Sequence, residues 1–219
     1  LVKKMIPAGF KMRMKTSSIL VIQKLFNFTS AYYSQFGEDV ILKNIFKDKR
    51  DGFYVDIGAF HPVVASNTYY FYSVRNWRGI NIEPAPGSTK TFEKVRPRDI
   101  NLEAAISDEE SELVYYFISE TSTMNSFSRE FLKSMDVLDK VTKEFNIKTQ
   151  SLESILDKYL PVNQTIDFMN VDVEGYDLSA LRSNNWDKYK PEVVLVEMEI
   201  SDISELEDAD IMKYMRSVG

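Results

Sequence analysis

One strand and the turn after it constrain the fold of this chain more than any other feature. The apolar run 53–55 ends in Asp56, and Gly58 follows two residues later. A short apolar run of this kind predicts a buried strand, and glycine permits a tight turn after it. The second run, 79–82, ends in the same way at Glu83. In open α/β sheets ligands lie beyond the carboxyl ends of the strands, where an acid ending the second strand can accept hydrogen bonds from ribose hydroxyls.

The glycine pattern indicates which kind of ligand this edge binds. A dinucleotide site needs G-x-G-x-x-G, but counted from Gly58 the second and third glycine positions hold Phe60 and Val63. A phenyl ring at the second position obstructs the close backbone approach that a pyrophosphate needs. We therefore expect a ligand without phosphates. S-adenosylmethionine fits, because its ribose would meet Glu83 and its cationic end would face Asp56. The alternative is that Asp56 and Gly58 only end a strand and cap the next helix.

The rest of the chain alternates between short apolar runs and amphipathic segments. Alternating strands and helices predict an α/β fold with a mostly parallel sheet and helices on both faces. In the first helix, the spacing places Val40, Ile41, Ile45 and Phe46 on one apolar face. We expect strands at about 53–57, 79–83, 99–106, 112–118, 147–150, 165–172 and 193–197, and helices at 37–47, through 69–74, from 88, at 151–158 and from 177.

Two segments depart from this alternation. We expect residues 1–33 to form a basic leader, helical or flexible, ahead of a single domain at 34–219. The leader could contact anionic lipid or a phosphorylated or lipid-linked substrate, or remain a solvated arm. Residues 119–145 begin with a run of Ser and Thr and break the rhythm of strands and helices. We expect them to form an insertion over the site, with an ordinary connection as the alternative.

Charge and cysteine content exclude several classes of function. The net charge is −6, and residues 1–37 hold six basic side chains and no acid, which leaves 21 basic against 33 acidic residues. A domain this acidic is not expected to bind nucleic acid. The chain has no cysteine, which excludes disulfides, thiolate metal sites and a cysteine nucleophile. The apolar run 19–22 is far shorter than the ~20 residues of a membrane helix. We therefore expect a soluble, cytoplasmic protein, in which only the leader could touch a membrane surface.

Four predicted strands end in carboxylates: Asp56, Glu83, Asp172 and Glu197. A single acid at a strand end means little, but four at one edge of a parallel sheet repel one another unless a cation or hydrogen-bond donors satisfy them. A bound sulfonium, a ribose and a substrate hydroxyl would do so. The competing occupant is a divalent cation on Asp172, Glu174 and Glu197, which are hard oxygen ligands.

Two residues are candidates for a catalytic base. His61, the only histidine, stands three residues after Gly58 on the loop that should border the ligand. A neutral imidazole could take the proton of a hydroxyl during methyl transfer. Asp172 is the alternative base, and a histidine that only shapes the loop is the alternative role for His61.

Several short motifs together resemble the FkbM-type methyltransferases over residues 34–200. They are Ser34-Gln35-Phe36-Gly37-Glu38-Asp39, Val55-Asp56-Ile57-Gly58-Ala59, Ser66-Asn67-Thr68, Asn81-Ile82-Glu83-Pro84, Ala104-Ala105-Ile106-Ser107 and Asp172-Val173-Glu174-Gly175-Tyr176-Asp177. The resemblance implies a Rossmann-like class I methyltransferase fold that uses S-adenosylmethionine. It also implies a final antiparallel strand pair, which we expect this sheet to lack because the sequence stops at Gly219.

The resemblance also implies residue roles. Asp56 and Gly58 would contact the methionine part of the cofactor, Glu83 the ribose, and Glu103 with Ala104 the adenine, although members often carry Asn at the position of Glu103. Asp172 would line the reaction centre. The cofactor site expected on this basis, without a metal, comprises Glu38, Asp56, Gly58, Ala59, Glu83, Pro84, Glu103, Ala104 and Asp172.

The function that the resemblance implies is O-methylation of a hydroxyl on a sugar or glycoconjugate. The acceptor would be a saccharide or another small molecule. The alternative is a non-catalytic Rossmann-like module that partners a glycosyltransferase, and retention of Asp56, Gly58, Glu83 and Asp172 argues against it. A nicotinamide oxidoreductase is disfavoured by the same departures from the glycine pattern that exclude a pyrophosphate.

Overall fold

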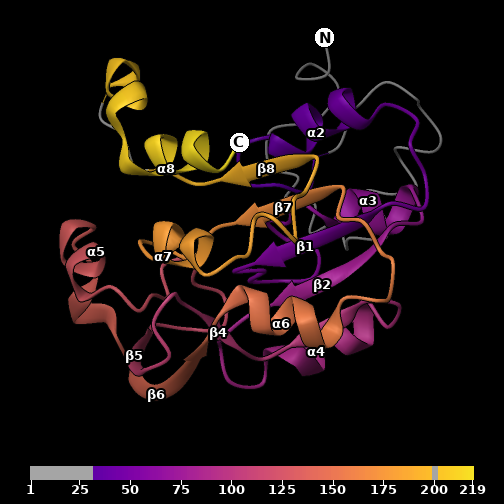
Figure 1. The fold of residues 1–219 in the computed structure, drawn as a ribbon. Coiled ribbons are helices and arrows are strands. Elements are labelled where there is room, and N and C mark those ends of the chain that lie inside the picture. Colours follow the sequence, from indigo (N-terminus) through magenta and orange to yellow (C-terminus); the bar gives the residue numbers. More distant parts are fainter. Residues whose placement is uncertain (1–31, 199–201) are drawn as a thin grey trace, which may run out of the picture. The chain divides into compact units, whose positions relative to one another are not determined.

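A parallel sheet of five strands forms the centre of the protein, in the order β3-β2-β1-β7-β8 (Figure 1). The structure is a computed structural model, and it describes residues 32–198 and 202–219. The leader expected at 1–33 therefore lies outside the described residues, except for its last two. The strands are β1 (Phe53–Ile57), β2 (Arg78–Ile82), β3 (Ile100–Leu102), β7 (Phe168–Val171) and β8 (Val193–Val196), and every neighbouring pair is parallel. The predicted α/β class and its parallel sheet are confirmed.

Helices cover both faces of this sheet, and strand β1 shows why. All five of its residues are buried, and they alternate between two apolar layers. Tyr54 packs with residues of α2 (Glu38–Phe46) and α3 (Tyr69–Val74). Val55 and Ile57 pack on the other face, in a cluster with residues of α6 (Leu152–Tyr159), α7 (Asp177–Arg182) and α8 (Asp210–Val218). A strand buried on both faces reads as a continuous apolar run, which is how the sequence predicts it.

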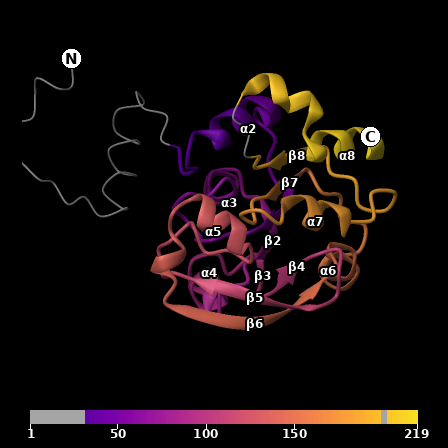
Figure 2. The same ribbon diagram turned by 90° about the vertical axis from the view of Figure 1, so that its left-hand side faces the viewer.

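A second sheet interrupts the regular order. The stretch expected as one strand over 99–106 instead forms two, because the chain leaves the main sheet after β3 and joins a three-stranded sheet, β4-β6-β5. This single-strand prediction is wrong. The second sheet consists of β4 (Ala105–Ile106), β5 (Glu112–Phe117) and β6 (Lys143–Gln150), and β5 and β6 lie side by side in Figure 2. The expected strand at 147–150 is thus the end of a longer one.

The first described helix, α2, presents a different face to the core from the one expected. Ile41 and Ile45 are 62% and 47% exposed, whereas Phe46, which was also expected on the apolar face, is buried together with Leu42. Asp39 is also buried, and its carboxylate accepts hydrogen bonds from the Tyr33 N–H (3.1 Å) and from Ser34 Oγ (2.9 Å). The buried side of α2 therefore includes a carboxylate whose hydrogen bonds are satisfied, and a pattern of apolar residues cannot predict this.

Two elements follow β5 before the chain returns to β6. They are α5 (Arg129–Ser134), whose N-cap Ser128 accepts from the Phe131 N–H at 3.0 Å, and a 3₁₀ turn at Leu138–Lys140. The helix α4 (Ser88–Val95) connects β2 to β3, and a second 3₁₀ segment, Ile203–Asp208, precedes α8. Within the described residues no strand follows β8. None of the described helices is long and apolar enough to cross a membrane.

Candidate active site

The carboxyl ends of the parallel strands bring most of the predicted site residues to one cavity. This first cavity encloses about 700 Å³, including its open mouth. Its lining includes six of the predicted residues: Asp56, Gly58, Ala59, Glu83, Pro84 and Asp172.

Glu83 ends β2 and holds the neighbouring turns in place. One carboxylate oxygen accepts a hydrogen bond from the Phe60 N–H (2.8 Å), and the other accepts one from the Ala85 N–H (2.9 Å). Tyr115 Oη lies 3.5 Å from the second oxygen. Burial raises the pKa of Glu83 above its usual value, and the two backbone donors oppose that shift. The oxygen bonded to the Phe60 N–H retains a lone pair for a hydrogen-bond donor of a ligand.

Asp56 lies within β1, whereas the other three acids follow the last residue of their strands. Thr68 Oγ1 donates to one oxygen (2.6 Å) and Asn170 Nδ2 donates to the other (2.9 Å). Asn67 Nδ2 in turn donates to Asn170 Oδ1 at 2.9 Å. Burial raises the pKa of Asp56, and these donors limit the shift. Asp56 therefore joins β1 to β7 and to the segment before α3, while it still lines the cavity.

A fully buried arginine, Arg96, donates hydrogen bonds to the residues around Asp56. Arg96 donates from Nη1 to Thr68 Oγ1 (2.7 Å), from Nη2 to Ser66 Oγ (2.6 Å) and from Nε to the Pro62 carbonyl (2.7 Å). It lies 4.0 Å from the Asp99 carboxylate. The guanidinium thereby fixes the loop between β1 and α3, whose Ser66 and Ala65 line the first cavity. Sequence reasoning missed Arg96, because a lone arginine ordinarily predicts an exposed side chain.

Gly58 is required by the contact between two turns. Its φ is +77°, and a Cβ added there would lie 1.7 Å from the carbonyl oxygen of Asp172. The turn after β1 therefore packs directly against the turn after β7, a contact that only glycine allows. The sequence predicts this turn but not the backbone group that it packs against, and Gly58 also lines the first cavity.

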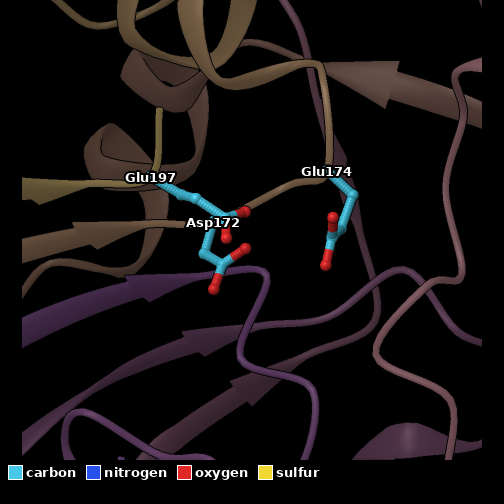
Figure 3. Close-up of side chains that lie close together, drawn as sticks. All are labelled: Asp172, Glu174 and Glu197. Carbon is cyan, nitrogen blue, oxygen red and sulfur yellow. The ribbon is translucent and has the colours of Figure 1, made fainter. Parts of the chain in front are cut away.

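Three carboxylates converge at the ends of β7 and β8 (Figure 3). Asp172, Glu174 and Glu197 each offer an oxygen atom, and these atoms lie within 4.8 Å of one another. Burial, followed by the charge of Glu197 and a hydrogen bond to it, raises the pKa of Asp172 to about 9. A proton shared between Asp172 and Glu197 relieves the repulsion between them. The same three oxygens also have the chemistry to bind a divalent cation.

His61, the other candidate base, lies at a different cavity from Asp172. It lines a third cavity with Pro86 and Thr91, and it does not line the first. Its Nδ1 accepts from the backbone N–H groups of Val63 (3.1 Å) and Val64 (3.0 Å), which places the ring proton on Nε2 in the neutral form. Burial, together with the charge of Arg96, lowers the pKa of His61. The structure thus brings Asp172, but not His61, to the first cavity.

Three other predicted residues lie around this cavity without lining it. Glu103 is exposed, and its carboxylate accepts from the Gly87 N–H at 2.7 Å. Ala104 is buried and lines a small cavity shared with Pro84 and Phe127. Glu38 lines a second cavity next to the first.

Residues from the segment after β5 complete the first cavity. Asn125, Ser126 and Phe127 line it, and Ser126 Oγ donates to the Glu174 carbonyl at 2.7 Å. The ring of Phe127 lies 4.8 Å from that of Tyr115, which also lines the cavity. Sequence reasoning missed Tyr115 and Asn170 as site residues. The signal for Asn170 was present, because it precedes Asp172 by two residues on one predicted strand.

The arrangement combines a buried carboxylate that can accept a hydrogen bond, an aromatic wall and a carboxyl pair that can hold or release a proton. Among the described residues that line the first cavity there is no Lys, Arg or His. A site of this kind suits a ligand that is neutral or cationic better than one with phosphates.

Comparison with known proteins assigns the family. The family model described as the methyltransferase FkbM domain matches residues 56–219, which is more than half of the chain. No curated protein and no solved structure matches the chain. The match begins at Asp56 and includes Glu83 and Asp172, together with the strands β2 and β7 that precede them. The chain therefore belongs to the FkbM family of methyltransferases.

Proposed function

We propose that this protein is an S-adenosylmethionine-dependent O-methyltransferase that acts on a hydroxyl of a sugar or glycoconjugate. The family implies use of S-adenosylmethionine. The observation that carries the proposal is that a second cavity, lined by Glu38, Glu197 and Met198, shares Asp172 with the first. Two adjoining cavities with a titratable group on their common wall suit a transfer between two bound molecules.

The residues of the first cavity fit this cofactor. Glu83 would accept hydrogen bonds from the ribose hydroxyls, and Pro84, Tyr115 and Phe127 offer an apolar wall for the adenine. In this proposal Ala104 supports that wall from behind, and Glu103 fixes the turn at Gly87. When bound, S-adenosylmethionine supplies an electrophilic methyl group on a positively charged sulfur. The carboxylate of Asp56, which lines the first cavity, favours that cation.

Asp172 is the base that we propose for the acceptor hydroxyl. A base must be within reach of the hydroxyl and must have a pKa near the working pH. In the empty site burial and Glu197 raise the pKa of Asp172 to about 9, and the positive charge of the cofactor would lower that pKa and release the carboxylate to act as a base. Asn67 and Asn170 line both cavities and can orient the hydroxyl through their amides. Phe36, which is 80% exposed and lines the second cavity, offers a ring face on which a sugar could stack.

The proposal is tested with the cofactor first and then with acceptors. We expect S-adenosylmethionine and S-adenosylhomocysteine to bind in calorimetric titrations, and labelled methyl groups to appear on members of a saccharide panel. Asp172→Asn should lose about 10²- to 10⁴-fold in turnover with cofactor binding retained. Asp187→Asn, at an exposed position, is the control and should change neither. No heat of binding at high micromolar cofactor would refute the enzyme, and cofactor binding without any transfer would favour the non-catalytic module that partners a glycosyltransferase.

A further inference from the structure

The second cavity lies at the ends of β7 and β8. It is lined by Phe36 and Glu38 from the turn that leads into α2, and by Glu197 and Met198 after β8. Five residues line both this cavity and the first: Gln35, Ala65, Asn67, Asn170 and Asp172. Whatever occupies the second cavity therefore meets the wall that carries the proposed base.

The charges of the second cavity are all of one sign. Glu38, Asp172 and Glu197 line it, and the described residues that line it include no Lys, Arg or His. A phosphate or carboxylate placed beside the carboxylates of Glu38 and Glu197 would be repelled, and it would find no side-chain cation to pair with among these lining residues. Hydroxyl and ammonium groups, in contrast, donate hydrogen bonds to carboxylates.

An unpaired acceptor on the common wall indicates the same preference. Asn67 Oδ1 is buried and has no hydrogen-bond partner in the described part of the chain. Its amide nitrogen is already used, since it donates to Asn170 Oδ1. A buried acceptor without a donor is costly, and a small movement of the Asn67 side chain, which lines both cavities, would present this oxygen to a hydroxyl or ammonium group of a ligand. An anion could not satisfy it.

We propose that the second cavity is the acceptor site, and that it selects acceptors which present hydroxyl groups or a protonated amine there and rejects those which present a phosphate or a carboxylate. This inference rests on the proposed function, because it takes the first cavity as the place of the cofactor. It excludes sugar phosphates and uronic acids that carry their charge near the reacting hydroxyl. Specificity of this kind comes from repulsion of the wrong ligand as much as from attraction of the right one.

The test uses Met198 as a reporter inside the cavity. The full chain is labelled with ¹³C-methyl methionine and saturated with S-adenosylhomocysteine, and the Met198 signal is assigned with Met198→Leu. Glucose, glucosamine and glucuronate serve as neutral, cationic and anionic probes of one size. We expect glucose and glucosamine to shift the Met198 signal, and glucuronate to need concentrations at least about tenfold higher.

Charge-neutral variants show whether the acids cause the ranking. The double variant Glu38→Gln and Glu197→Gln should remove most of the difference between glucosamine and glucuronate. Glu192→Gln, at the opposite end of β8, is the matched control and should preserve it. The inference is overturned if glucuronate binds as well as glucosamine, or if no probe moves Met198. Failure of the proposed function is recognised separately, because S-adenosylhomocysteine would then not bind.

Discussion

At the scale of single residues, each acid of the site has a different environment. Asp56 has both oxygens occupied by side-chain donors, Glu83 has both occupied by backbone donors, and Asp172 faces other carboxylates. One type of side chain thus serves three purposes: it joins elements, it shapes a turn and it holds a proton. The environment of each carboxylate, and not its presence in the sequence, decides which of these purposes it serves.

Glu83 gives a direct test of the cofactor site. Glu83→Gln keeps a carbonyl oxygen but replaces a charged acceptor by a neutral one and adds a donor. We expect cofactor binding to weaken by about 1–3 kcal/mol, measured by calorimetry. Glu93→Gln on the exposed side of α4 should leave the dissociation constant unchanged. A Glu83→Gln protein with unaltered affinity would show that the ribose does not lie at this carboxylate.

His61 gives a test that separates the two candidate bases. Because its Nδ1 accepts two backbone hydrogen bonds, His61→Ala should lower the free energy of unfolding by about 1 kcal/mol. Turnover should stay within about tenfold of the native value if Asp172 is the base. Steady-state kinetics at saturating cofactor would decide, and a loss of 10²-fold or more with binding preserved would assign the base to His61 instead.

At the scale of elements, the turns after β1 and β7 depend on each other. Gly58→Ala places a methyl group against the Asp172 carbonyl, so we expect a loss of about 2–4 kcal/mol in the free energy of unfolding. Gly87→Ala is the matched control, because Gly87 also has a positive φ, of 85°, but nothing within 4 Å of the added carbon. It should cost only about 1 kcal/mol. Equal losses in urea unfolding would contradict the close contact between the turns.

The elements also show what the sequence could and could not predict. The alternation of apolar and amphipathic runs identified the strands of the main sheet, because a strand buried on both faces is apolar throughout. It could not show that the chain leaves this sheet after Leu102, because both sides of the break are apolar. The buried face of α2 was missed for a related reason: the acid beneath it, Asp39, is satisfied by Tyr33 and Ser34. Hydrogen bonds between segments leave no periodic pattern of apolar residues in the sequence.

At the scale of the whole molecule, burial of acids makes stability depend on pH. Burial raises the pKa of Asp172 to about 9 and that of Asp177 to about 6, and it also raises those of Asp56, Glu83 and Asp99. The folded protein therefore binds more protons than the unfolded chain between about pH 4 and pH 9. Stability should accordingly fall as the pH rises through this range.

Thermal unfolding from pH 5 to pH 9 tests this expectation. We expect the melting temperature to decrease with pH, and Asp172→Asn to flatten the decrease and to add about 1–3 kcal/mol to the free energy of unfolding at pH 8. Asp157→Asn is a suitable comparison, because pairing with Lys188 lowers the pKa of that carboxylate. A melting temperature that rises from pH 6 to pH 9 would mean that the buried acids are ionised in the folded state.

The contact between Gly58 and the Asp172 carbonyl has a mechanical consequence. Because the two turns touch, neither can shift without displacing the other, so we expect this part of the first cavity to keep its shape when a ligand binds. Residues between 122 and 127 also line that cavity, and Ser126 Oγ joins them to the Glu174 carbonyl after β7. We expect motion during turnover to be greater in this segment than in the two turns, which should look the same in the empty and the loaded protein.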